Sequence, residues 1–175
     1  PERSAQRNYG ANKAKGTYVV FLDADMQLTP NVVEECVETF AKKKVGAIII
    51  PEKSIGEGFW AKIKAFERSF YVGDDTIEAA RFYDKEIFKK VGGFDEQITG
   101  PEDWELSERV KKAYGLGHIS SYILHNEGKL SLQTLMKKKR YYGRKTAVYL
   151  KKTNRAAVSP QTVFFLRKSF YRHPG

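Results

Sequence analysis

The chain begins by alternating between the hydrophobic pattern of a helix and that of a buried strand. Residues 4–15 predict a helix, with Ser4 as its N-cap and Gly16 directly after its end. The run TYVVFL over 17–22 is rich in β-branched and aromatic residues, and its apolar positions do not alternate with polar ones. This pattern indicates a strand buried on both faces, as in a parallel sheet.

The same order of elements then repeats. Thr29 is the expected N-cap of a second helix, which has Pro30 at its first position and reaches about Lys44. The run VGAIII over 45–50 predicts a second buried strand. An order of helix, strand, helix, strand favours an α/β fold in which a mostly parallel sheet is flanked by helices.

Shorter patterned segments follow along the rest of the chain. They predict helices over 59–72, 84–91 and 102–114, strands over 79–83 and 119–124, and a basic helix from Leu130 to about Lys152.

Composition narrows the expected compartment. The chain has no run of about 18 apolar residues, so a membrane-spanning helix is not expected. No apolar region follows its first residues, which excludes a signal peptide at this position. The lone cysteine, Cys36, excludes an internal disulfide and fits a reducing compartment. We therefore expect a cytoplasmic protein or one at the cytoplasmic face of a membrane.

Positive charge is concentrated at the end of the chain. Residues 1–125 carry a net charge of −2, whereas 126–175 hold 13 Lys and Arg against Glu127 alone, a net charge of +12. This asymmetry predicts a globular domain over 1–125 followed by a basic helical extension over 126–175. It also indicates an anionic partner, such as a phosphate group, nucleic acid or an acidic membrane surface.

Two carboxylates directly follow the first predicted strand. In an open parallel sheet, ligands bind beyond the carboxyl ends of the strands, and Asp23 and Asp25 stand at such an end. Two acids this close repel each other unless a hard divalent cation such as Mg²⁺ or Mn²⁺ lies between them. The same spacing also fits an acidic turn that caps the next helix.

A second acidic segment opens the helix predicted over 102–114. Glu102 and Asp103 lie in its first turn, where the helix dipole stabilises negative charge, so helix capping alone explains them. The functional interpretation makes one of them a general base that deprotonates a hydroxyl nucleophile. His125 follows the last predicted core strand and would supply a neutral nitrogen to the same cation, although a lone histidine is more often structural.

These motifs occur in an order that resembles family 2 glycosyltransferases with the GT-A fold, a Rossmann-related α/β architecture. The resemblance rests on RNYGANKAKGTYVVFLDAD over 7–25, on GGFDEQITGPEDWELSERV over 92–110, and on His125. It implies inverting, metal-dependent transfer of a sugar from a UDP- or GDP-sugar to a hydroxyl group. The implied cofactor is Mn²⁺ or Mg²⁺, and the implied acceptor is a glycan or a lipid phosphate.

The resemblance also implies a role for each matched residue. Asp25 would bind the metal together with His125, and Asp23 would contact the metal or the ribose of the donor. Asp103 would be the base that activates the acceptor. Arg7 and Asn8 would lie near the donor nucleotide, and Glu102 with its neighbour Trp104 would shape the acceptor side. Arg81, at the end of a loop that starts near Gly73, is a further candidate acceptor contact.

The chain departs from the family pattern in two respects. It starts at the helix before the Asp-x-Asp strand, which predicts a catalytic domain that lacks its first βαβ part and is inactive alone. Gln133 is followed by Thr134 and Leu135 without the Arg-Trp of processive synthases, so addition of a single sugar is expected.

The basic extension leaves an alternative function open. Residues 137–140 are all Lys or Arg, and the tyrosines that follow suit a nucleic-acid or anionic-surface binding module. Nucleic acid is not the expected partner, because the acidic motifs would repel its phosphates. An anionic bilayer fits an amphipathic basic helix, and a solvated helix face remains the simplest alternative.

Overall fold

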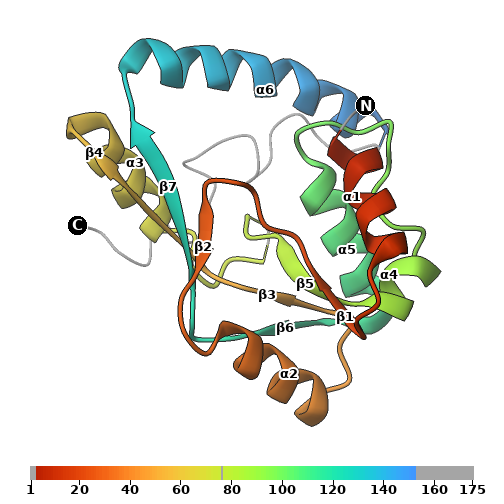
Figure 1. Cartoon of the computed structure of the whole chain (residues 1–175). Coiled ribbons are helices and arrows are strands. Elements are labelled where there is room, and N and C mark those ends of the chain that lie inside the picture. Colours follow the sequence, from red (N-terminus) through yellow and green to blue (C-terminus); the bar gives the residue numbers. More distant parts are fainter. Residues whose placement is uncertain (1–2, 76, 153–175) are drawn as a thin grey trace.

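The structure is a computed structural model that describes residues 3–75 and 77–152, with side chains as far as residue 143. Within these residues the chain forms two sheets surrounded by helices (Figure 1). No helix in the described part of the chain has the length and apolar character needed to cross a bilayer.

The larger sheet has four strands and carries most of the core. Its middle strand β5 runs antiparallel to both of its neighbours, whereas β3 and β6 are parallel. The strand order is β1 (Tyr18–Val20), β5 (Ala80–Asp84), β3 (Ala47–Ile49) and β6 (Leu116–His118).

A smaller sheet of three strands continues from the first. Its central strand pairs antiparallel with one neighbour and parallel with the other. The order is β2 (Met26–Leu28), β7 (Ile123–Lys129) and β4 (Glu52–Glu57).

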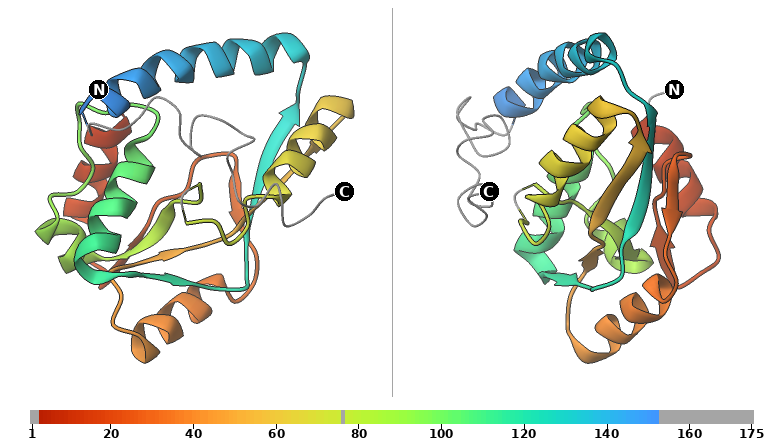
Figure 2. Two further views of the ribbon diagram at one scale, coloured as in Figure 1. Left: turned by 180° about the vertical axis from the view of Figure 1, so that it is seen from behind. Right: turned by 90° about the vertical axis from the view of Figure 1, so that its left-hand side faces the viewer.

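Helices cover both faces of the larger sheet (Figure 2). Alternate residues of β3 point to opposite sides, so that Ile49 packs with α1, α4 and α5 while Ile48 packs with α2. The helices are α1 (Arg3–Lys13), α2 (Val32–Lys42), α3 (Phe59–Ser69), α4 (Lys85–Lys90), α5 (Glu102–Tyr114) and α6 (Leu132–Lys152).

The predicted α/β class with flanking helices is confirmed, but the expected mostly parallel pairing is wrong for the described strands. Only the pairs β3–β6 and β4–β7 are parallel, because β5 lies between β1 and β3 in the opposite direction. A continuous apolar run reports burial on both faces and carries no information on strand direction, so the sequence pattern did not distinguish the two arrangements.

Both predicted N-caps are wrong. Ser4 lies inside α1, where its buried hydroxyl donates to the carbonyl of Ile98 at 3.4 Å. Helix α2 begins at Val32 after Asn31, which has a left-handed φ of 69°. Thr29 instead donates both its hydroxyl and its backbone N–H to the carbonyl of Tyr122. Both hydroxyl groups therefore bond to distant chain segments and cap neither helix.

The predicted strand over 119–124 is also wrong. The chain forms β6 and β7 on either side of a bend at 119–122, so His125 lies within a strand rather than after one. Strand β7 passes through the predicted domain boundary at residue 125 and continues to Lys129. The basic helix expected from Leu130 is present as α6.

Candidate active site

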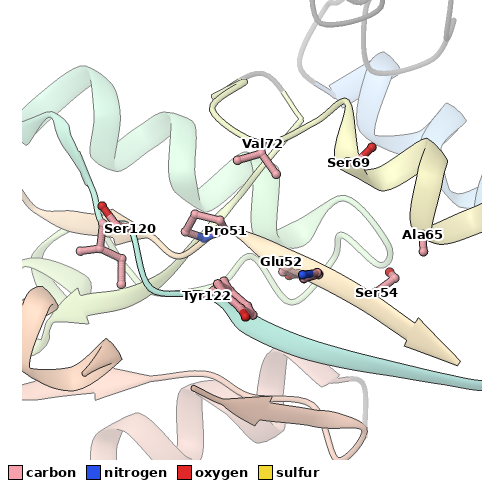
Figure 3. Close-up of a pocket in the computed structure, with 10 residues that line it drawn as sticks. Pro51, Glu52, Ser54, Ala65, Ser69, Val72, Ser120 and Tyr122 are labelled. Atoms are coloured by element: carbon pink, nitrogen blue, oxygen red, sulfur yellow. The ribbon is translucent and has the colours of Figure 1, made fainter. Parts of the chain in front are cut away.

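A pocket of about 480 Å³ lies beside strand β4 (Figure 3). Its walls come from β4, from the end of α3 and from the bend between β6 and β7. None of the residues predicted for the site lines it, and it approaches the acidic motifs only through Glu52. The lining residues are Pro51, Glu52, Lys53, Ser54, Ala65, Ser69, Val72, Ile119, Ser120 and Tyr122.

Strand pairing brings Asp25 to His125, although the two are 100 residues apart. Strand β2 starts directly after the Asp-x-Asp turn, and its first residue, Met26, is paired with His125 in β7. The backbone N–H of Asn126 also donates to the carbonyl of Asp25 at 2.8 Å. As a result, Nε2 of His125 lies 3.3 Å from Oδ2 of Asp25.

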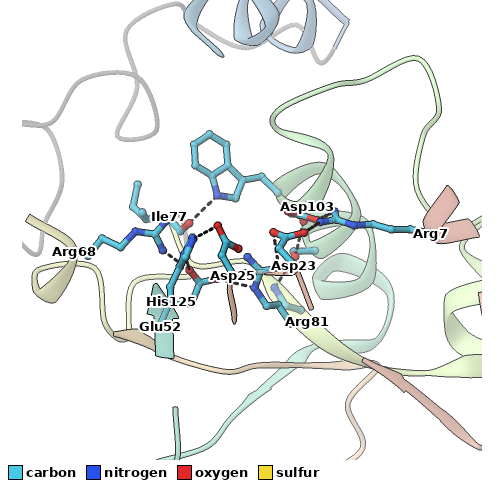
Figure 4. A network of polar contacts seen from close by, with 12 residues as sticks. Arg7, Asp23, Asp25, Glu52, Arg68, Ile77, Arg81, Asp103 and His125 are labelled. Carbon is cyan, nitrogen blue, oxygen red and sulfur yellow. Dashed lines mark hydrogen bonds and ion pairs between the residues drawn. The ribbon is translucent and has the colours of Figure 1, made fainter. Parts of the chain in front are cut away.

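The other nitrogen of His125 faces Glu52, across the parallel pairing of β4 with β7 (Figure 4). The Nδ1 atom lies 3.4 Å from Oε2 of Glu52. Each ring nitrogen of His125 therefore faces a carboxylate, and either nitrogen can carry the proton in the absence of a cation. A cation bound between Nε2 and Asp25 would leave the proton on Nδ1, where Glu52 accepts it.

Glu52 is held as a carboxylate by three neighbours. Nε of Arg81 donates to it at 2.6 Å, and Arg68 forms an ion pair with its other oxygen. Burial raises the pKa of Glu52, but the hydrogen bond from His125 and the charges of Arg81 and Arg68 outweigh burial, so that the pKa lies far below its ordinary value. Glu52 is therefore ionised at any pH at which the protein works.

Arg7 joins the first aspartate of the turn to the acidic helix. Its Nη2 donates to Oδ1 of Asp23 at 2.7 Å, and its Nη1 donates to Oδ1 of Asp103 at 2.8 Å. Burial raises the pKa of Asp23, but the charges of Arg7 and Arg81 outweigh burial and the pKa is lowered. Helix α1 therefore sets the distance between two carboxylates that come from distant segments.

Glu102 is buried next to Arg7. Its side chain is 1% exposed and faces Nη2 of Arg3 at 3.0 Å and Nη1 of Arg7 at 3.7 Å. Neither carboxylate oxygen has a hydrogen-bond partner among the described residues. In this position Glu102 holds Arg7 by charge, and a contact with an acceptor would require it to leave its pocket.

Asn8 forms two hydrogen bonds with the backbone of Phe94, at the end of the Gly92-Gly93-Phe94 turn. Its amide donates to the carbonyl of Phe94 at 2.9 Å, and its Oδ1 accepts from the backbone N–H of the same residue at 2.9 Å. Gly93 has a φ of 65°, and a Cβ there would lie 2.6 Å from Oδ1 of Asn8. The structure thus places Asn8 as a support for this turn, and its predicted contact with the donor stays a prediction.

The two remaining predicted residues connect parts of the site. Nε1 of Trp104 donates to the carbonyl of Ile77 at 2.7 Å, which ties α5 to the segment before β5. Arg81 is buried between Glu52 and Asp23, with Nη1 3.9 Å from Oδ2 of Asp23. In Figure 4 Arg81 lies between the His125 side and the Arg7 side of the network.

The model for glycosyl transferase family 2 matches residues 2–94, which is more than half of the chain.

The chain belongs to glycosyl transferase family 2.

The match covers the Asp-x-Asp turn and the Arg-Asn pair of α1 and ends at Phe94, before Asp103 and His125. No curated protein matches this family 2 chain.

Two solved structures have the same fold as this family 2 member. S. aureus TarS superposes with a TM-score of 0.55 at 15% identity, over 95% of this chain and 33% of TarS. GalNAc-T7, in a crystal structure with UDP, GalNAc and Mn²⁺, has a TM-score of 0.54 at 18% identity, over 98% of this chain and 41% of GalNAc-T7. The GT-A fold is thereby confirmed, and the chain spans about a third to two-fifths of these proteins.

Few donor atoms of the described residues lie close enough together to bind a divalent cation. No group of three or more His, Cys, Asp and Glu side chains in the described part of the chain is arranged to hold a metal ion. Asp25 and His125 form a pair, whereas Asp23 faces Arg7 and Arg81. One carboxylate and one imidazole suit a Mn²⁺ or Mg²⁺ that takes its other ligands from phosphate and water.

Sequence reasoning missed Glu52 and Arg68. Glu52 had a signal of the same kind as Asp23, because it is the first acid after a buried apolar run, here 45–50. Arg68 had no comparable signal, since it lies in the middle of the helix predicted over 59–72 and only tertiary packing turns it toward Glu52.

Proposed function

We propose that this family 2 domain transfers one sugar from a UDP- or GDP-sugar to a hydroxyl acceptor, with inversion and with a divalent cation. The observation that supports the proposal most is a continuous network of polar contacts. It runs from Asp25 through His125, Glu52 and Arg81 to Asp23, and from there through Arg7 to Asp103. The network joins the pair proposed to bind the cation to the residue proposed as the base. The likeness to a structure that contains UDP, GalNAc and Mn²⁺ is consistent with this assignment.

On the donor side, Asp25 and His125 hold Mn²⁺ or Mg²⁺ in this proposal. When bound, the cation neutralises the diphosphate of the donor and so makes it a better leaving group. Asp23 is separated from Asp25 by one residue of the turn, and Arg7 holds its carboxylate by a hydrogen bond. In this proposal Asp23 accepts a hydrogen bond from a hydroxyl group of the ribose. In this proposal Glu52 is a positioning residue, because it contacts Nδ1 of His125 and accepts the proton of Nδ1 when Nε2 binds the cation.

On the acceptor side, Asp103 takes the proton of the attacking hydroxyl group. The acceptor oxygen forms its bond to the anomeric carbon while the bond from that carbon to the diphosphate oxygen breaks. The electron pair of the broken bond leaves with the nucleoside diphosphate. One displacement from the opposite face inverts the anomeric configuration, and the ion pair with Arg7 holds the carboxylate of Asp103 in place.

The acceptor in this proposal is a glycan or a lipid phosphate. Residues 137–140 of α6 are basic and exposed, and Glu127 is the last acidic residue of the chain. Such a helix suits peripheral contact with an anionic membrane, where lipid phosphates are concentrated.

A screen of nucleotide-sugars with Mn²⁺, on a chain that also includes the first βαβ part expected from the GT-A resemblance, tests the proposal, with Asp103→Asn as the variant. Loss of a general base is expected to lower turnover by about 10²- to 10⁴-fold, while calorimetry finds the affinity for the nucleotide nearly unchanged. Glu86→Gln, at an exposed residue of α4, is the control.

Turnover retained in Asp103→Asn would remove this residue from the base role. If Mn²⁺ and nucleotide bind without any mutual dependence, the donor–metal part of the proposal is wrong.

A further inference from the structure

Two basic residues of helix α3 face the protein interior. Nζ of Lys64 lies 3.4 Å from the buried carboxylate of Glu127, and Arg68 pairs with Glu52. Ala61, which is 1% exposed, lies on the same face of the helix. The side that normally carries large apolar residues therefore holds one alanine and two cations.

The opposite face of α3 is apolar and open to solvent. Phe59, Ile63 and Phe66 are 69%, 41% and 63% exposed. Their spacing of four and then three residues places them on one side of the helix, over about 10 Å of its length. A contiguous stripe of large apolar side chains on a helix whose packing face is polar indicates an interaction surface.

A second exposed apolar group lies at the start of α6, close to this stripe. A Cβ on Gly56 of β4 would lie 2.7 Å from the carbonyl oxygen of Gly128 in β7 and 3.0 Å from Cβ of Ala61 in α3. The start of α3 is thus packed against the ends of both strands, and α6 begins three residues after β7. Figures 1 and 2 show α3 and the start of α6 at the same end of the smaller sheet. Leu132 and Met136 are 47% and 61% exposed there.

We propose that the outer face of α3 (Phe59, Ile63 and Phe66) and the first turns of α6 form one surface that docks on an anionic phospholipid bilayer. This inference rests on the membrane contact proposed above for α6 and adds the part of the chain that inserts. Large apolar side chains enter the boundary between headgroups and acyl chains, while the basic residues 137–140 meet lipid phosphates. The α6 sequence contains no acid that would oppose this contact.

Vesicle binding of the full chain tests the surface. Sedimentation is measured with vesicles of phosphatidylcholine alone and of phosphatidylcholine with phosphatidylglycerol. The variant Phe59→Ser/Ile63→Ser/Phe66→Ser is expected to bind the anionic vesicles at least tenfold more weakly than the parent chain. The matched control is Val33→Ser/Val37→Ser, at two exposed valines of α2, which is expected to bind like the parent.

Trp60 provides a second measurement on the docking surface itself. Its ring centre lies 5.4 Å from that of Phe59, and Trp104→Phe leaves it as the only tryptophan of the chain. Its emission is expected to shift to shorter wavelength on anionic vesicles and to be quenched by brominated lipids.

Two results would overturn the inference. One is unchanged vesicle binding of the triple variant together with unquenched Trp60 fluorescence. The other is a dimer of the parent chain that the triple variant dissociates, because the stripe would then be buried between two copies. Calorimetry with UDP and Mn²⁺ runs in parallel, so a failure of the donor site is distinguished from a failure of the docking surface.

Discussion

At the residue scale, Glu52 controls the state of His125. Its carboxylate lies beside Nδ1 of the ring and compensates the charges of Arg81 and Arg68. Glu52→Gln removes the charge and allows the ring to change its tautomer. We expect the affinity for Mn²⁺ in the presence of UDP to fall about 10- to 100-fold, measured by calorimetry.

The metal-free protein provides an independent measurement of the same change. ¹⁵N NMR of the His125 ring is expected to report a larger share of the Nδ1–H form in the parent than in Glu52→Gln. Glu57→Gln, at an exposed residue of the same strand, serves as the control. An unchanged tautomer combined with an unchanged Mn²⁺ affinity would show that Glu52 does not position His125.

Glu78 makes the stability of the protein depend on pH. Burial, together with the nearby charges of Glu52 and Asp75, raises the pKa of Glu78 from 4.5 to about 7, despite the hydrogen bond that it accepts from the N–H of Gly73. The folded state therefore binds this proton more tightly than the unfolded state. The contribution of Glu78 is complete below pH 4.5 and is lost as the pH rises toward 7.

Glu78→Gln is expected to remove this loss. Since one pKa unit corresponds to about 1.4 kcal/mol, we expect the variant to be more stable than the parent by about 2 kcal/mol at pH 8, after allowance for partial exposure. At pH 4 the two should be nearly equal. Urea unfolding at both pH values measures the difference, and the same difference at both would exclude titration of Glu78 as its cause.

At the scale of elements, the contact between α1 and the turn after α4 depends on Gly93. Its φ of 65° is unfavourable for any residue with a Cβ, and Asn8 leaves no space for one. We expect Gly93→Ala to lower the free energy of unfolding by about 2 kcal/mol or more, measured by denaturant unfolding.

Gly143 is the matched control for this substitution. It lies in α6, and a Cβ there would meet no atom within 4 Å. Gly143→Ala is therefore expected to be neutral or to stabilise the helix by up to about 1 kcal/mol. If both substitutions changed the free energy of unfolding equally, the hydrogen bonds of Asn8 would not stabilise the turn.

The elements also explain which features were predictable from the sequence. The run 45–50 located β3 because both faces of that strand are buried. Strands β2 (MQL) and β4 (EKSIGE) were missed, since their polar sequences pair with β7 without an apolar pattern of their own. The pairing of β2 with β7 is also what brings Asp25 to His125. The site residues carried recognisable motifs, whereas the contacts that join them depend on strand order.

At the scale of the whole molecule, strand β7 determines where the globular part ends. Beyond the predicted boundary at residue 125, Asn126 still pairs with β4 and donates to the carbonyl of Asp25. Glu127 is buried and faces Lys64, and Leu130 is part of the core. The basic extension that can be removed without loss of these contacts therefore starts after residue 131, at α6.

Two truncated chains test this division. A chain of residues 1–125 loses half of β7 and leaves Lys64 and Arg68 without the buried carboxylate of Glu127, so we expect it not to unfold cooperatively. A chain of residues 1–131 keeps all of β7, and we expect cooperative unfolding with a midpoint close to that of the full chain. Circular dichroism during thermal unfolding measures both. Equal stability of the two chains would mean that the second half of β7 adds nothing to the fold.

The 1–131 chain also separates the two proposed binding sites. Its binding of UDP with Mn²⁺ should persist, because the proposed donor site lies wholly before α6. Its binding to anionic vesicles should be lost, because the basic residues 137–140 belong to α6, which this chain lacks.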